Sequence, residues 1–261
     1  TDPDVTDPVV TDPDTTTPGP IIIADPTLMS VTLNWDIPVK RQDGAVLSIS
    51  EIDKYIDFVK EYIIVTNNMD EVGYTLINSE NKIRVVSEDS ILKEKYIEID
   101  NPSDEQKKWM LSASIINIES LDNEFVFLHD NYRPLKKISI DYFISFEGRY
   151  NAYYYYDLIN WNSINTVYDN GQCNSKQVLN ERHYELMSYS SHSPQIINKT
   201  IFQEAIAEFF QDGLDMPLDE WTIYFNYGVS KYPYLFNKKV FETLNWPLVP
   251  TDWRIRYEPE A

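Results

Sequence analysis

Short apolar runs that end in polar residues recur along the first half of the chain. They are rich in β-branched, aliphatic and aromatic residues and lie at 31–37, 61–66, 82–87 and 125–128. Runs of this length bounded by polar residues are typical of buried strands. The run at 125–128 is apolar throughout, which predicts a central strand that is covered on both faces.

Three segments instead carry apolar residues at helical spacing. They cover residues 48–59, 103–116 and 200–211. The second begins with Ser103 and Gln106, a capping-box pair that starts a helix. Because strands and helices alternate over residues 27–140, this part of the sequence predicts an α/β fold, with a mostly parallel sheet flanked by helices.

The second half of the chain, residues 141–261, has a different pattern. It is rich in aromatic residues, and four tyrosines follow one another from Tyr153 to Tyr156. We interpret it as a cap on the first half, with a polar loop at 160–176 and a helix or strand at 221–227. Aromatic residues beside Asn and Asp suit a sugar-binding face, but they also build ordinary cores, and both interpretations stay open.

The first 26 residues read as an acidic linker. Residues 1–20 repeat Thr-Asp-Pro, and each proline restricts its own backbone and that of the residue before it. This composition cannot bury enough apolar surface to fold. We expect an extended strap without helix or sheet, held by a protein neighbour, followed by one domain at 27–261.

Composition and charge exclude several classes of protein. The formal net charge of −20 repels nucleic acid and anionic membranes, so neither is an expected partner. The single cysteine, Cys173, excludes an intramolecular disulfide framework. No stretch is apolar enough to span a membrane, and no glycine-rich dinucleotide or phosphate loop is present. We expect a cytoplasmic or virion-associated protein rather than a secreted disulfide protein.

The strongest chemical signal follows the run at 125–128. The run ends in His129, Asp130 and Asn131. A buried strand that delivers an acidic residue at its carboxyl end is how open α/β sheets present a ligand- or metal-binding group. The alternative is an ordinary exit into a turn, because Asp and Asn are common turn residues.

Taken in order, several segments resemble the Stealth group of sugar-phosphate transferases and the related GT-A-like nucleotide-sugar transferases. The matching segments are residues 34–36, 47–66, 84–89, 120–131 and 191–199. The clearest is 120–131, which is similar to the family's Ser-Glu-Phe-Ile-Tyr-Phe-Asn-Asp-Asp strand. The resemblance covers roughly residues 30–250 and implies a GT-A-like sheet. The implied function is a nucleotide-sugar-dependent glycosyl- or sugar-phosphate transferase that acts on a glycan or surface component.

The resemblance also implies a divalent metal site. Asp130 would be the metal-binding carboxylate, and Mg²⁺ or Mn²⁺ would bridge it to the diphosphate of a nucleotide sugar. Where the family has Asp-Asp, this chain has Asp130 and Asn131. Asn131 offers a carbonyl oxygen but no charge, so we expect the metal to be held weakly.

Four further residues gain roles from the resemblance. Asp36 would contact the base or ribose, His192 would act as a base or position a phosphate, and Arg133 and Lys199 would contact phosphates. Each has a simpler interpretation. Asp36 fits a turn at a strand end, His192 a hydrogen-bonded loop residue, and the two cations solvated surface charge.

A second function from a different class remains open. Asn131 lowers the charge of the metal site, and Ile37 and Pro38 replace a family glycine after the first strand. Together with the strap, these departures favour a catalytically degraded, transferase-like module that decorates a larger assembly such as a phage virion. A bare carbohydrate-binding module would rest on the aromatic residues alone.

Overall fold

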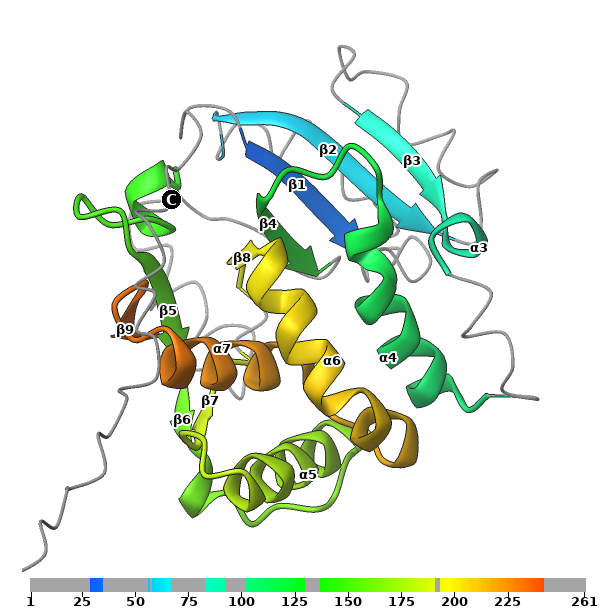
Figure 1. Cartoon of the computed structure of the whole chain (residues 1–261), viewed down its shortest axis with the longest axis vertical. Coiled ribbons are helices and arrows are strands. Elements are labelled where there is room, and N and C mark those ends of the chain that lie inside the picture. The colour runs from blue at the N-terminus through cyan, green and yellow to red at the C-terminus, as the bar shows by residue number, and fades with distance from the viewer. Residues whose placement is uncertain are drawn as a thin grey trace, which may run out of the picture.

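The computed structural model describes residues 29–34, 56, 58–66, 83–92, 102–129, 137–190 and 193–241, with 29–34 and His129 as backbone only. Its largest sheet has the strand order β3-β2-β1-β4-β8. The strands are β1 (Met29–Asn34), β2 (Val59–Thr66), β3 (Ile83–Ser87), β4 (Glu124–His129) and β8 (Gln195–Asn198). Figure 1 shows this sheet with helices packed beside it.

The sheet is mostly parallel, as the sequence predicts. β1 pairs in parallel with both β2 and β4, and β2 pairs in parallel with β3. β4 pairs with β8 in the antiparallel sense. All four side chains at 125–128 are buried, so the predicted central strand is confirmed. The all-apolar run is explained by the layers that cover both faces of β4.

Of the five helices that the structure describes, all but α3 begin with a side-chain cap. The helices are α3 (Glu88–Ile91), α4 (Asp104–Ser114), α5 (Val167–Glu181), α6 (Lys199–Asp215) and α7 (Glu220–Lys231). The predicted capping box of α4 is formed, because Gln106 N–H donates to Ser103 Oγ at 3.2 Å and Ser103 N–H donates to Gln106 Oε1 at 2.9 Å. Residues 221–227, for which helix and strand were both open, lie in α7.

The rest of the described residues include two small sheets and three 3₁₀ turns, of which η2 belongs to the first half of the chain. The strands are β5 (Tyr150–Tyr154), β6 (Tyr156–Asp157), β7 (Met187–Ser188) and β9 (Phe236–Val240), and the turns are η2 (Ile115–Asn117), η3 (Ile140–Tyr142) and η4 (Leu158–Asn160). β5 pairs with β9 and β6 with β7.

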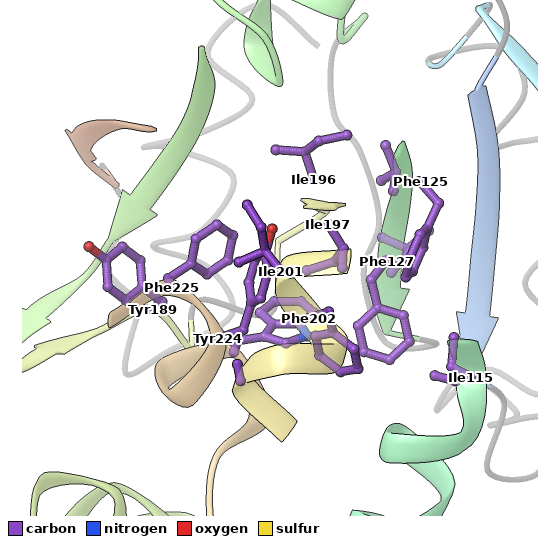
Figure 2. Packing of buried hydrophobic residues seen from close by; sticks show 14 of the residues in the cluster. Ile115, Phe125, Phe127, Tyr189, Ile196, Ile197, Ile201, Phe202, Tyr224 and Phe225 are labelled. Atoms are coloured by element: carbon purple, nitrogen blue, oxygen red, sulfur yellow. The ribbon is translucent and has the colours of Figure 1, made fainter. Parts of the chain in front are cut away.

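The core lies between the sheet and helices α6 and α7. Figure 2 shows aromatic side chains from these helices pointing toward β4 and β8. The ring of Phe202 on α6 lies 5.7 Å from that of Tyr224 on α7, between ring centroids. Many of the tyrosines and phenylalanines of the second half are therefore core residues, which supports the simpler of the two interpretations for them.

The loop predicted at 160–176 is wrong, because α5 begins at Val167. Its start is a capping box formed by Thr166 and Asp169. The buried face of this helix includes Gly171, Gln172 and Ser175 alongside Val178 and Leu179. A face built from small and polar residues has little hydrophobic periodicity, so the pattern resembles a loop.

Other predictions lie outside the described residues. These include the strap at 1–20, the boundary at residue 26 and most of the helix predicted at 48–59, whose last residue begins β2. Among the helices that the structure describes, none has the length and apolar character needed to cross a membrane.

Candidate functional site

The order of the parallel strands reverses at β1. From β1 the chain continues outward to β2 and β3, and then returns to β4 on the other side of β1. The last residues of the two central strands, Asn34 and His129, are paired in the ladder. Ligands of open α/β sheets bind beyond the carboxyl ends of strands at such a reversal. We call this side of the sheet the carboxyl edge and the opposite side the amino edge.

The predicted metal and nucleotide residues follow these strand ends in the sequence. Asp36 comes two residues after β1, and Asp130 and Asn131 come directly after β4, followed closely by Arg133. All four lie outside the described residues, so their roles remain predictions. The structure does show that the two strand ends from which they continue are neighbours.

His192 also lies outside the described residues, next to a segment that is described. Ser193 is buried, and Gln195, the first residue of β8, pairs with Phe127 near the end of β4. Gln195, three residues after His192 in the sequence, therefore lies beside the carboxyl end of β4. The described ends of β1 and β4 and the start of β8, which neighbour three of the predicted site segments in the sequence, lie at the same edge of one sheet.

Lys199 is placed elsewhere. It follows the end of β8, where Asn198 pairs with Glu124 at the start of β4. Its backbone N–H donates to Asn123 O at 2.7 Å, and its Nζ donates to Leu121 O at 3.5 Å. Lys199 thus lies at the amino edge, and the structure does not bring it to the edge from which Asp36 and Asp130 continue.

An acidic pair near the carboxyl edge escaped the sequence reasoning. Asp219 and Glu220 lie at the start of α7, and the next residue, Trp221, packs its ring edge-to-face on Phe127, with centroids 5.7 Å apart. Glu220 is only 6% exposed, and its Oε1 has no hydrogen-bond partner among the described residues. Buried carboxylate oxygens normally have partners, so this oxygen is an exception within the described part of the chain.

Asp219, the other member of the pair, has a perturbed pKa. Burial raises its pKa, and the adjacent charge of Glu220 raises it further. Hydrogen bonds from Ser190 and from Thr222, whose N–H donates to Asp219 Oδ1 at 2.8 Å, oppose this rise in pKa. Adjacent carboxyl groups with a perturbed pKa are typical of proton-transfer sites.

The acidic pair is linked to the segment of His192. Ser190 hydrogen-bonds Asp219 and precedes His192 by two residues. Tyr168 of α5 donates its hydroxyl to Ser190 O at 3.3 Å. Burial, followed by the charge of Asp219, raises the pKa of Tyr168 to about 12, so this phenol stays protonated as a donor. In the sequence, Asp and Glu ahead of an amphipathic stretch look like an ordinary helix start, which is why the pair was missed.

A second buried polar cluster lies at the amino edge. Glu124 Oε1 accepts hydrogen bonds from Tyr150 Oη at 3.0 Å and Asn198 Nδ2 at 3.1 Å. Asn198 also accepts from Ile201 N–H, which caps α6, and its own N–H donates to the hydroxyl of Tyr224 at 2.8 Å. These bonds join β4, β5, β8, α6 and α7. We therefore interpret the cluster as a structural network that holds these elements together, and not as a binding site.

Metal ligands are not assembled within the part of the chain that the structure describes. No group of three or more His, Cys, Asp or Glu side chains there is placed to hold a metal ion. The predicted ligands Asp130 and Asn131 belong to the residues that are not described.

No family model matches the sequence, and no curated protein matches it. Solved structures give distant similarities. A 4-diphosphocytidyl-2C-methyl-D-erythritol synthase from Anaerococcus prevotii is 11% identical with a TM-score of 0.48, and the match covers 87% of this chain and 93% of that one. The apo form of mouse xyloside xylosyltransferase 1 is 11% identical with a TM-score of 0.45, over 89% of this chain and 91% of that one. Both TM-scores are too low for either structure to assign a function.

Proposed function

We propose that the chain is a transferase that uses a nucleotide-activated sugar and binds it at the carboxyl edge between β1 and β4. The observation that carries this proposal is the pairing of Asn34 with His129 where the strand order reverses. Consecutive Cα atoms are about 3.8 Å apart, so Asp130 begins one such step beyond that pair. The proposal agrees with the resemblance of segments 34–36 and 120–131 to GT-A-like enzymes.

The donor set at this edge fits a hard divalent cation. Asp130 would supply a carboxylate and Asn131 a carbonyl oxygen, and both follow β4 directly in the sequence. Oxygen donors of this kind suit Mg²⁺ and Mn²⁺. When bound, the cation would neutralise charge on the diphosphate leaving group. Since only one of the two donors is charged, binding would depend strongly on the phosphates of the nucleotide.

Glu220 is the group to which we assign proton transfer. Its Oε1 has no hydrogen-bond partner among the described residues, so a substrate hydroxyl that reaches the buried start of α7 would find an acceptor there. Asp219 is occupied as the N-cap of α7 and holds the start of this helix in place. A carboxylate that accepts the proton of an attacking hydroxyl typically contributes about 10²–10⁴-fold to the rate.

An architectural function is the alternative. Asn131 stands where the resembling family has a second acidic residue, so a chain that lost metal binding could have kept the fold as a module of a larger assembly. In that case the carboxyl edge would bind no nucleotide.

Calorimetry with UDP, CDP and GDP in the presence of Mn²⁺ tests the proposal. We expect the wild type to bind one of them, Asp130→Ala to lose this binding and Asn131→Asp to tighten it. Asp122→Ala is the matched control, because Asp122 precedes the opposite end of the same strand and forms a surface ion pair with Lys60 at 3.3 Å. If wild type and Asn131→Asp both bind nothing, the transferase proposal fails and the architectural function stands.

A further inference from the structure

A series of aromatic side chains leads from the surface of the second half toward the acidic pair. We call Tyr155, Tyr156, Trp161 and Tyr168 the aromatic ridge. Its ring centroids are separated by 6.4 Å, 5.5 Å and 5.7 Å in that order. The outer two tyrosines are exposed, whereas Tyr168 is half-buried. The ridge is therefore continuous from solvent to the interior.

The surface around the ridge is unusually apolar. Ile159, Ile164 and Val167 are each more than half exposed in the same short stretch of sequence. Single exposed apolar residues are ordinary, but several within one segment beside exposed rings mark a binding surface. The core does not need these side chains, since they lie outside it.

The inner end of the ridge meets the candidate site. Tyr168 donates to Ser190 O, and Ser190 hydrogen-bonds Asp219, the first residue of the acidic pair. A ligand lying along the ridge would thus point its inner end toward Asp219 and Glu220. A surface that only bound another protein would not need this hydrogen-bonded path from Tyr168 to Asp219.

The chemistry of the segment favours an uncharged ligand. Residues 155–168 contain one charged side chain, Asp157, in a chain whose net charge is −20. That carboxylate accepts a hydrogen bond from Ile159 N–H at 2.8 Å and so caps the turn that follows it. The remaining polar groups include three neutral amides, Asn160, Asn162 and Asn165. Amides both donate and accept hydrogen bonds, as sugar hydroxyls require.

The aromatic ridge also contains a hydrogen-bond donor that is unsatisfied within the described part of the chain. Trp161 Nε1 has no hydrogen-bond partner among the described residues, although the atom is buried. An indole N–H is a donor only, so it calls for an acceptor oxygen. Aromatic faces bordered by a few convergent polar groups are the usual composition of a small-molecule or sugar site.

We propose that the aromatic ridge binds a neutral glycan and holds it as the acceptor, with one hydroxyl directed to the acidic pair. The role of this glycan as the acceptor rests on the proposed transferase function. The pyranose faces stack on the exposed rings of Tyr155 and Tyr156, and the Asn side chains of the segment exchange hydrogen bonds with hydroxyl groups. Anionic glycans are disfavoured, because the chain as a whole is strongly negative.

The test uses the full chain on a glycan array that carries neutral and anionic oligosaccharides, followed by calorimetry with the best neutral binder. Tyr156→Ala should weaken binding about tenfold, in line with the loss of a stacking contact. Tyr156→Phe should retain it, because the ring remains. Tyr234→Ala is the matched control, since Tyr234 is 48% exposed, Tyr156 is 42% exposed, and Tyr234 lies outside the ridge.

The outcomes separate this inference from the proposed function. If the wild type binds a nucleotide but no neutral glycan, or if Tyr156→Ala and Tyr234→Ala behave alike, the inference is overturned and the transferase stands. If neutral glycans bind through Tyr156 but no nucleotide binds, the ridge is a glycan site without the transferase. If analytical ultracentrifugation shows self-association that Tyr156→Ala abolishes, and no glycan binds, the ridge is an interface between copies of the chain.

Discussion

The indole of Trp221 stands edge-on to the ring of Phe127, with the two planes inclined by 70°. Phe127 lies near the carboxyl end of β4, and Trp221 directly follows the acidic pair. Both side chains are buried. This contact fixes the start of α7 against the strand from which Asp130 continues, and so joins the second half of the chain to the candidate site.

Replacing Glu220 by Gln should slow sugar transfer without weakening nucleotide binding. The amide has nearly the same shape but cannot accept a proton, so we expect turnover to fall about 100-fold or more. The measurement is release of nucleoside diphosphate from a panel of nucleotide sugars with a glycan acceptor. Glu208→Gln on the exposed face of α6 is the control. Equal turnover in both variants would remove Glu220 from the mechanism.

The stability of the fold should depend on the ionisation of Asp219. Because the pKa is raised in the folded state, the folded protein binds the proton more tightly than the unfolded chain. Stability should therefore fall as pH rises from the ordinary value of 3.8 through the raised folded pKa. Asp219→Asn keeps a good N-cap and removes the charge, so it should flatten this slope.

Urea denaturation between pH 4 and pH 8 measures the effect. Glu220→Gln provides an independent comparison, since removing its charge should lower the pKa of Asp219 and also reduce the slope. A slope that is the same in wild type and in Asp219→Asn would show that Asp219 does not cause it.

A methyl group at Gly213 should be poorly tolerated. A Cβ built there would overlap the indole ring of Trp109, so α4 and α6 would have to move apart. We expect Gly213→Ala to destabilise the fold by about 1–3 kcal/mol. Chemical denaturation gives the value.

Gly171→Ala is the matched control for this prediction. The nearest atoms to a Cβ at Gly171 are 3.9 Å away, and the residue lies inside α5. Alanine is the better helix former by roughly 0.5–1 kcal/mol, so this variant should be neutral or stabilising. Equal losses in the two variants would contradict the close packing of Gly213 on Trp109.

Removing the amide of Asn198 should damage both a helix cap and a buried network. Asn198→Ala deprives Ile201 N–H of its acceptor and leaves Glu124 and Tyr150 with fewer partners. Loss of a cap costs about 1 kcal/mol and a buried group without its partner about 1–3 kcal/mol, so we expect about 2–4 kcal/mol in total.

Denaturation of Asn198→Ala measures this cost, and Thr200→Ala, an exposed change two residues away, is the comparison. If the free energy of unfolding falls by less than about 0.5 kcal/mol, the range of ordinary surface changes, water replaces the amide. The cluster would then contribute little to the stability of the fold.

Much of the sheet could be predicted from the sequence because its signals are local. The all-apolar run at 125–128 and the capping box of Ser103 and Gln106 each lie within a few residues, and both appear in the structure. Strand β8 was not predicted, because its four residues are too few to show a period. Its place in the sheet depends on pairing with β4, which no local pattern encodes.

The candidate site was predictable only in part, for the same reason. The sequence singled out residues that follow strand ends, since a strand followed by Asp is a local signal. The role of Glu220 depends on Trp221 reaching Phe127 across the fold, so nothing near residue 220 distinguishes it from a helix start. Lys199 is the opposite case, because its sequence motif suggested a site residue but the fold places it at the amino edge. Asp36 and Asp130 follow strand ends at the carboxyl edge.

The hydrogen bond between Asn198 and Glu124 also bears on how the protein is made. The two residues are 74 positions apart, and Glu124 begins the strand that β8 completes. During translation, one side of β4 stays unpaired until this much further chain has been synthesised, which takes roughly 4–15 s at ordinary rates of 5–20 residues per second. Throughout that interval the nascent chain exposes an apolar strand edge, so chaperones that bind such edges are expected to protect it on the ribosome.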